Sequence, residues 1–287
     1  MTAALPHAAT VWHALGDPWE QGVIRRGLAE VVLLGVTGGT LGCWVIFYQL
    51  SYSAESLAHA LFPGLVLAAL TGLPLLLGGA AGIVVAAGAV AVAGRTPVVG
   101  RDTAVAVVVT GLFGLGVLLA LSATTPPGIA NLLFGDILGS SDGDLALAGA
   151  LSLCVLIVIW RLHGRLLAVG FDRASAPSLG LAPLRVDLAL LALLALAVLI
   201  AVQGLGNLLV VAILVGPAAT ARRLARRIVP MMAIATALAI ASGIGGLYLS
   251  FYAHTAAGGS IAGVIVALYL AVEAATAARG GIAAVSA

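Results

Sequence analysis

Glu55 and His59 lie four residues apart in the stretch SAESLAHALFPG, at the start of a long apolar run. A spacing of four places two side chains on one face of a helix. Carboxylate oxygen and imidazole nitrogen together suit zinc, manganese or ferrous iron, so the pair is a partial coordination site for a divalent cation. The same spacing is typical of an ion pair on a helix surface, worth about 0.2–0.5 kcal/mol. The spacing alone leaves both interpretations open.

Three further histidine and cysteine positions bear on metal chemistry. His254, in SFYAHTAAGGSIAG, lies in a short turn between two apolar segments and is a third candidate metal ligand; the alternative is an exposed loop histidine. Cys43 and Cys154 fall inside apolar segments without a Cys-x-x-Cys spacing, which favours small buried side chains over a redox pair. The metalloprotease motif His-Glu-x-x-His is missing from the sequence, so an intramembrane metalloprotease is disfavoured.

The composition assigns the chain to the membrane. Of 287 residues, 62% are hydrophobic and 8% are charged, and the mean hydropathy is +1.19. A soluble domain carries about 25% charged residues, so this composition cannot cover a water-exposed surface. All 13 basic residues are arginines. A phosphate-binding P-loop needs a lysine, so the chain does not hydrolyse ATP by that route and we expect it not to be an enzyme.

Apolar runs long enough to cross a bilayer predict an all-α fold, a polytopic bundle of eight or nine transmembrane helices. The runs are 27–48, 57–77, 79–94, 103–121, 145–160, 186–202, 205–218, 229–252 and 260–278. We expect three parts: an N-terminal interfacial segment (1–26), a transmembrane domain (27–278) and a C-terminal tail (279–287). Glycine pairs with small-xxx-small spacing, such as Gly35/Gly39, Gly38/Gly42 and Gly78/Gly82, predict close helix packing.

Local signals surround the Glu55/His59 pair. Ser53 is of the residue type that caps the start of a helix. Pro63-Gly64 predicts a break or kink shortly after His59.

The arginines predict the orientation. They gather in three loops, around Arg95, around Arg165 and around Arg223, which pairs of predicted spans place on one face. By the positive-inside rule this face is cytoplasmic. Arg25 and Arg26 do not fit, because three predicted spans before Arg95 place the N-terminus outside; either these two arginines break the rule or one early segment does not fully cross. The acidic loop at 122–144 and the turn at His254 then lie on the opposite face.

The stretch GPAATARRLARR belongs to the cytoplasmic face. Pro217 is predicted to end an apolar run, and a short helix is predicted to follow with Arg222, Arg223, Arg226 and Arg227. Such a helix is either a positive-inside anchor or a docking surface for a soluble partner, because arginine offers forked donors to carboxylates and backbone.

Six stretches together resemble the membrane permeases of metal-ion ABC transporters, the family that serves zinc, manganese and iron uptake. They are SAESLAHALFPG, GRDTAVAVVV, LLFGDILGSS, GFDRASAPSLGL, QGLGNLLVVAILVGPAATARRLA and GLYLSFYAHTAAGGSIAG, in the family's order. The resemblance implies a multi-pass permease of the bacterial cytoplasmic membrane, with Glu55 and His59 at the membrane metal site. Glu55 departs from the family's more usual aspartate, which leaves the metal's identity open.

The resemblance also implies partners. These are cytoplasmic ATP-binding-cassette subunits, an extracytoplasmic metal-binding protein and a second permease chain, most simply an identical one, with no nucleic acid. Residues Pro217, Thr220, Ala221 and Arg222 match the family's ATPase-facing region. The metal is cargo, and no permanently bound cofactor is expected. The alternative is a proton-coupled secondary transporter without an ATPase, using Glu30, Glu55 or Glu273, since transporters carry intramembrane acids and broken helices.

Overall fold

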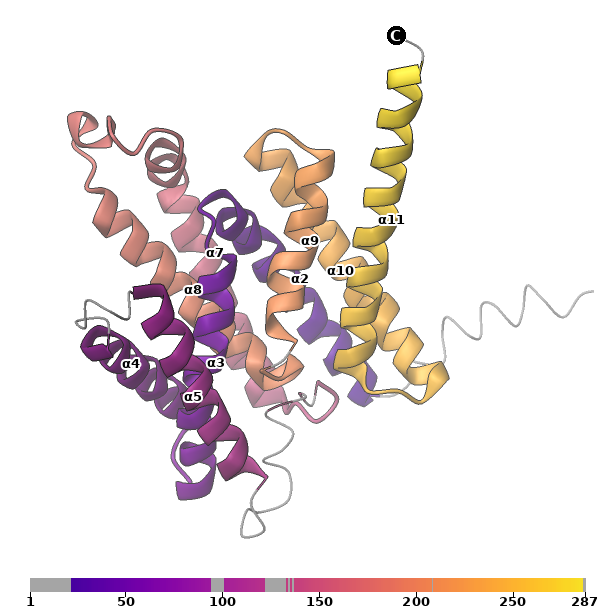
Figure 1. Cartoon of the computed structure of the whole chain (residues 1–287). Coiled ribbons are helices and arrows are strands. Elements are labelled where there is room, and N and C mark those ends of the chain that lie inside the picture. Colours follow the sequence, from indigo (N-terminus) through magenta and orange to yellow (C-terminus); the bar gives the residue numbers. More distant parts are fainter. Residues whose placement is uncertain are drawn as a thin grey trace, which may run out of the picture.

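The structure is all helical over the part of the chain that it describes (Figure 1). It is a computed structural model, and it describes residues 22–93, 101–121, 133, 135, 137–207 and 209–285, without the side chains of 101, 102, 104 and 279–285. The helices are α2 (Gly22–Phe47), α3 (Ser51–Thr71), α4 (Leu75–Ala93), α5 (Arg101–Ala120), α7 (Asp142–Phe171), the 3₁₀ turn η1 (Ala176–Leu179), α8 (Pro183–Leu205), α9 (Val210–Leu224), α10 (Ile228–Ala253) and α11 (Ala257–Val285). The predicted all-α fold class is confirmed. Most of the predicted interfacial segment at 1–26 lies outside the described residues.

Seven of the described helices are long and apolar enough to cross a membrane: α2, α3, α4, α7, α8, α10 and α11. Helix α5 has a shorter apolar stretch, Val105–Ala120, and α9 is 15 residues long. By length and composition, therefore, seven crossings are supported where eight or nine were predicted.

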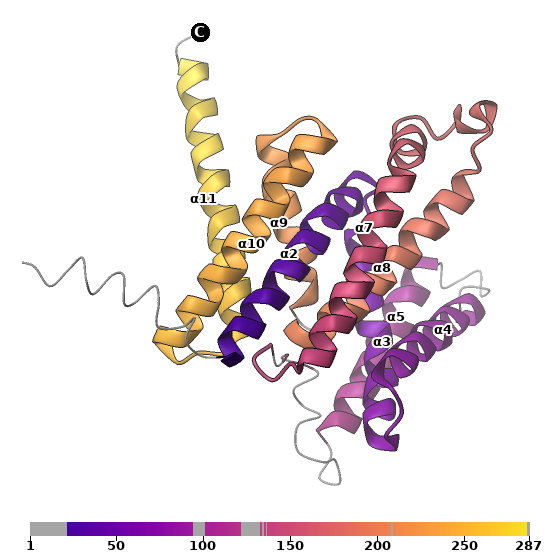
Figure 2. The same cartoon turned by 180° about the vertical axis from the view of Figure 1, so that it is seen from behind.

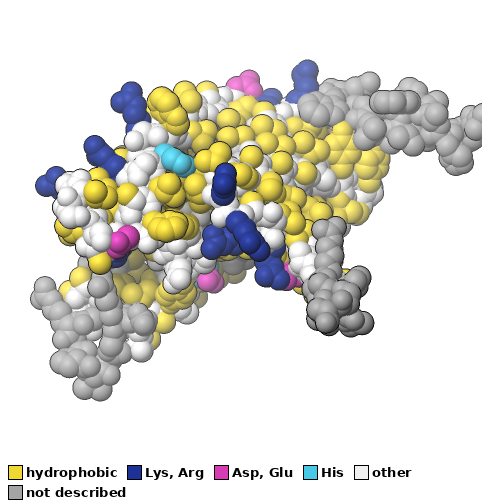
Figure 3. All heavy atoms as spheres, turned by 90° about the horizontal axis from the view of Figure 1, so that it is seen from above, with side chains coloured by type: hydrophobic (Ala, Val, Ile, Leu, Met, Phe, Trp, Pro, Cys, Tyr) yellow, Lys and Arg dark blue, Asp and Glu magenta, His cyan; other side chains and the backbone are white. Residues whose placement is uncertain are grey.

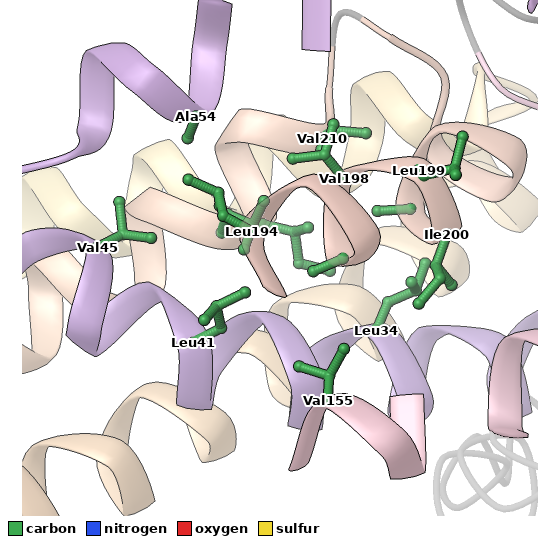
Figure 4. Packing of buried hydrophobic residues seen from close by; sticks show 14 of the residues in the cluster. Leu34, Leu41, Val45, Ala54, Val155, Leu194, Val198, Leu199, Ile200 and Val210 are labelled. Carbon is green, nitrogen blue, oxygen red and sulfur yellow. The ribbon is translucent and has the colours of Figure 1, made fainter. Parts of the chain in front are cut away.

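Helix α2 lies at the centre of the bundle. It packs against α10, α9 and α7, while α3, α4 and α5 form a neighbouring group that α8 joins to α7 (Figures 1 and 2). Helix α11 lies against α9 and α10. Figure 4 shows the core where α2, α3, α7, α8 and α9 meet, and it is aliphatic. Leu41, Val45, Ala54, Val155 and Val198 are fully buried there.

Glycines on two faces of α2 bring its neighbours close. A Cβ added at Gly39 would stand 2.6 Å from the backbone of Thr236 in α10, and one added at Gly42 would collide with the Leu214 carbonyl of α9. Small residues at helix contacts let backbones approach in lipid, where apolar burial alone does not drive association. The predicted small-xxx-small packing of α2 is confirmed.

Most of the described arginines gather at one end of the bundle. The α7–α8 connection and the α9–α10 turn both lie at this end, and Figure 3 shows arginine side chains spread over it. The start of α2, residues 137–141 and the α10–α11 turn lie at the other end. The predicted grouping is confirmed for the arginines of these two connections, whereas Arg25 and Arg26 lie in the first turns of α2 at the other end, and the loop around Arg95 lies outside the described residues. That the arginine-rich end is cytoplasmic stays a prediction from the positive-inside rule.

Two local predictions about α3 are wrong, and a third is wrong in part. The helix spans Ser51–Thr71 where hydropathy suggested 57–77, because its polar first turns are helical and Gly72, with φ 71°, ends it in a left-handed cap. Leu50 is the N-cap, without a side-chain cap bond, and Ser53 lies inside the helix. The helix is also not broken at Pro63, which transmembrane helices tolerate when neighbouring helices pack around the freed backbone. The alternative, a kink there, stays a prediction.

The short helix predicted after Pro217 is wrong as well. Pro217 lies inside α9, Arg222 and Arg223 occupy the last turn of that helix, and Arg227 is the N-cap of α10. Thr220 donates its hydroxyl to the Gly216 carbonyl at 2.9 Å, in the turn that Pro217 would otherwise weaken. The arginines therefore occupy a tight turn between two packed helices.

We expect Gly39→Val to destabilise the bundle by about 1–3 kcal/mol, the usual cost of overpacking. The added side chain meets backbone, which cannot rotate away. Gly88→Val on α4 is the matched control, because nothing lies within 4 Å of a Cβ there. Thermal unfolding in detergent should show a lower midpoint for Gly39→Val only; equal midpoints would contradict the close contact.

Candidate metal site and cytoplasmic turn

The start of α3 is held by the turn that precedes it. Helix α2 ends in a Schellman arrangement: Leu50 donates its N–H to the Val45 carbonyl at 2.8 Å, and Gln49 to the Ile46 carbonyl at 3.2 Å. Gln49 takes the left-handed conformation, φ 58°, that glycine usually fills. The turn lies below the α9–α10 turn in both views, so α3 begins inside the bundle (Figures 1 and 2).

Tyr48 fastens this turn to α7. Its hydroxyl donates to the Leu166 carbonyl at 2.7 Å. Burial raises the pKa of Tyr48 to about 12, and the negative charge of Asp187 adds to the shift. The phenol is therefore a neutral hydrogen-bond donor at physiological pH, and the contact keeps α3 in a fixed position relative to α7.

Glu55 and His59 share one face of α3, as their spacing predicted. Glu55 is exposed on the surface of this single chain, and His59 is half-buried. The His59 ring stacks on Phe113 of α5, with ring centroids 4.3 Å apart and planes at 18°. Its Nδ1 atom is buried, and no group in the described part of the chain hydrogen-bonds to it. The stack holds the imidazole in one orientation beside an open carboxylate.

Pro63 of α3 and Gly116 of α5 shape the backbone next to His59. Pro63 has no N–H, so the His59 carbonyl lacks the usual donor four residues ahead. A Cβ at Gly116 of α5 would lie 2.7 Å from the Phe62 ring and 3.0 Å from the Pro63 nitrogen, so glycine is what lets α5 reach α3. Within one chain the site thus offers a carboxylate and an imidazole.

This donor set is incomplete within one chain. Among the described residues, no cluster of three or more His, Cys, Asp or Glu side chains is suited to holding a metal. Beside the site, a cavity of about 350 Å³ lies between α3, α4, α5 and α8, and Tyr52, Ser53 and Ser56 supply its polar lining from α3. A closed zinc site takes four ligands, so two side chains suit an ion that binds and leaves.

His254 lies in the α10–α11 turn, at the end of the bundle opposite the α9–α10 turn. It is the C-cap of α10, exposed, with φ 53° and its N–H bonded to the Ser250 carbonyl. Histidine is enriched several-fold in this left-handed conformation, which gives the residue a structural role. Within one chain it is not brought together with Glu55 and His59 (Figure 1), and its role in metal binding stays a prediction.

The predicted coupling residues divide into two sets. Pro217, Thr220 and Ala221 are buried, and the alanines of this stretch pack against Cys43 of α2. The four arginines are exposed. A soluble partner would therefore meet the arginines, while the buried residues join the turn to α2.

Sequence reasoning missed two contacts of the membrane acids. Glu30 is buried in α2, accepts a hydrogen bond from the Ser140 hydroxyl at 2.5 Å and packs against Gly204 of α8. Glu273 of α11 is paired with Arg223, whose Nε lies 2.8 Å from Oε1 and whose second nitrogen lies 2.8 Å from Oε2. An acid inside an apolar run is the only sequence signal for either pair.

The comparison with known families decides the class of protein. The model of the ABC 3 transport family matches residues 20–276. The chain belongs to this family. It is accordingly a multi-pass protein of the cytoplasmic membrane.

Individual relatives of this ABC 3 chain cover most of its length. The manganese transport system membrane protein MntC of Halalkalibacterium halodurans is 30% identical over 239 residues, 83% of this chain and 82% of the relative. A probable iron transport system membrane protein of Haemophilus influenzae is 28% identical over 245 residues, 85% of this chain and 90% of the relative. The solved structure of PsaBC from Streptococcus pneumoniae in complex with Fab superposes with a TM-score of 0.85 at 25% identity, covering 91% of this chain and 95% of that one.

The Arg223–Glu273 pair predicts a measurable link between α9 and α11. Its two hydrogen bonds form a fork, but both side chains are partly exposed, so we expect a coupling energy of roughly 0.5–1 kcal/mol. A double-mutant cycle with Arg223→Gln, Glu273→Gln and the double variant, followed by thermal unfolding in detergent, measures it. Strictly additive effects would contradict the pair.

Proposed function

We propose that this ABC 3 chain is the permease subunit of an ATP-binding-cassette importer for a divalent metal ion. Its relatives named for manganese and iron transport support the cargo class. The observation that carries the proposal is the exposed Glu55 side chain beside a His59 ring stacked on Phe113, in an apolar helix. Carboxylate with imidazole also suits zinc, and the donor types do not choose among the three metals.

The incomplete donor set favours a site shared between two permease chains. A second copy that brings its own α3 face would double the carboxylates and imidazoles to the four ligands of a small metal site. The exposed Glu55 supports this, because a charge in lipid costs about 2.5–3.5 kcal/mol unless it meets a partner or a cavity.

The remaining partners follow the two ends of the bundle. The extracytoplasmic binding protein docks near residues 137–144 and the His254 turn, and the ATPase subunits meet the arginines of the α9–α10 turn. We also propose that α5 and α9 cross the membrane despite their length, giving nine crossings. The alternation of helix direction along the chain supports this number (Figure 1).

Glu55→Gln and His59→Ala should each abolish metal uptake, because either change removes a ligand of the ion. Glu55→Asp should keep uptake, since it retains the carboxylate. Asp172→Asn is the matched control for the acid-to-amide change: Asp172 is exposed, and an amide oxygen can still accept the N–H groups of Ala174 and Ser175. The measurement is uptake of radioactive manganese into proteoliposomes with the ATPase present.

Assembly and energy source are checked in the same vesicles. Glu55→Gln must still co-purify with the ATPase, which separates a lost ligand from a lost fold. Normal uptake by Glu55→Gln would contradict the site and leave the family membership intact. Metal flux through the permease without the ATPase would instead favour the proton-coupled transporter.

Uptake should also fall in acid. A metal ligand must be a neutral imidazole, whose ordinary pKa is about 6.5, and protonation below it competes with the ion. Well below that value, we expect the affinity of the permease for the metal to fall roughly tenfold per pH unit. Isothermal titration of the permease with manganese between pH 5 and 8 measures this; an unchanged affinity would show that His59 is not a ligand.

A further inference from the structure

A small cavity lies in the core of the bundle, where α2, α7, α8 and α9 meet. It offers the centre of a water molecule about 10 Å³ of room. Leu34 of α2 and Ile200 of α8, both labelled in Figure 4, form part of its apolar wall. A cavity of this size holds a single water molecule, provided that two to four polar groups bind it.

Two hydroxyl groups line this cavity. Thr37 of α2 and Ser152 of α7 are 3% and 1% exposed, and neither hydroxyl has a hydrogen-bond partner in the described part of the chain. A serine or threonine inside a helix can bond the carbonyl four residues before it, as Thr220 does with Gly216. Thr37 and Ser152 do not, and a buried hydroxyl without a partner destabilises a fold. The two hydroxyls therefore indicate a bridging group between them.

A backbone carbonyl of α9 adds a third oxygen. Pro217 has no N–H, so the Ile213 carbonyl lacks the donor that a helix usually supplies four residues ahead. Ile213 lines the cavity together with Gly38 of α2, and a Cβ added at Gly38 would stand 3.3 Å from that carbonyl oxygen. The oxygen therefore faces α2, and glycine leaves the space next to it open.

We propose that this cavity binds one ordered water molecule, which joins Thr37, Ser152 and the Ile213 carbonyl. The two hydroxyls donate to the water oxygen, and the water donates to the carbonyl. Three hydrogen bonds are the usual number for a buried water. Ordered waters can satisfy the backbone groups that proline leaves free in membrane helices. The site does not depend on the proposed metal transport.

The lining selects a neutral molecule over an ion. Apart from Thr37 and Ser152, the described residues that line the cavity have apolar side chains or none, and no carboxylate is among them. A cation would bring a charge without a counter-charge into the membrane interior, which is costly. Water satisfies the same oxygens without that cost. It also ties α9 to α2 and α7 at the level where Pro217 interrupts the hydrogen bonds of α9.

Removing one hydroxyl distinguishes a bridged cavity from an unbridged one. Thr37→Val keeps the shape of the side chain and removes its oxygen. With the water in place, the change should lower the midpoint of thermal unfolding in detergent by roughly 2–4 °C, because the water loses a partner. A hydroxyl without any partner would give the opposite sign, since its removal relieves an unsatisfied buried group. A raised midpoint would therefore overturn the proposal.

The same change is then made in a chain whose α9 carbonyl has its donor. Pro217→Ala returns an N–H to the Ile213 carbonyl, so Thr37→Val should lower the midpoint by less in that background. Thr40→Val is the matched control, because Thr40 lies on the same helix, faces Thr236 at 3.4 Å and does not line the cavity. Its effect should be equal in both backgrounds. An equal effect of Thr37→Val in both would contradict a water bound to the carbonyl.

An experimental density map of the full-length chain, at a resolution that shows ordered water, tests the site directly. We expect one peak within hydrogen-bond distance of the three oxygens, and its loss in Thr37→Val with Ser152→Ala. A map of the unaltered chain without this peak would refute the site. Replacing sodium with choline in the buffer should change neither the peak nor the unfolding midpoint; a midpoint that rises with sodium concentration would assign the cavity to a cation and end the proposal.

Discussion

A charge inside an apolar bundle must have a partner, and this constraint separates one acid of the described membrane helices from the others. Glu30 accepts a hydroxyl from Ser140, and Glu273 is bound to Arg223. Glu55 has neither a hydroxyl donor nor an arginine partner within the described part of the chain, and its side chain is exposed. Since the cost of such a charge is several kcal/mol in lipid, an unpaired carboxylate indicates a partner that the single chain lacks. A cation and a second permease chain both meet that need.

The surroundings of Glu55 are fixed by packing and hydrogen bonds, although its own side chain is exposed. The Schellman turn and the Tyr48 hydroxyl fix the start of α3, and the Phe113 ring fixes the imidazole. Gly116 allows that ring to approach, and Pro63 leaves a carbonyl without its helical donor. A fixed imidazole loses less entropy on binding an ion than a mobile one, so at the proposed metal site this packing would strengthen binding without adding ligands.

The sequence predicted the all-helical fold and the main apolar runs, because hydropathy and small-residue spacing determine them locally, whereas seven crossings are supported by length where eight or nine were predicted. It placed α3 six residues too late, since Ser51, Ser53 and Glu55 look polar to hydropathy while tertiary packing makes them helical. Pro63 and Pro217 suggested breaks, yet neighbouring helices hold both in continuous helices. The contact of His59 with Phe113 joins residues 54 positions apart, and no local pattern encodes it. The Glu55/His59 face was predictable because a period of 3.6 residues fixes it.

The buried part of the α9 stretch explains how a cytoplasmic push reaches the metal site in the proposed importer. Ala218 and Ala221 pack against Cys43, and the Leu214 carbonyl fills the space where Gly42 has no side chain. Close-packed backbones cannot slide past each other without separating, so a displacement of α9 carries the end of α2 with it. The end of α2 continues through Gln49 and Leu50 into α3. Ala54 lies in the first turn of α3, and Glu55 follows it directly. In the proposed importer the arginines would therefore receive the force, the alanines would transmit it, and the α2–α3 turn would deliver it to the face of Glu55 and His59.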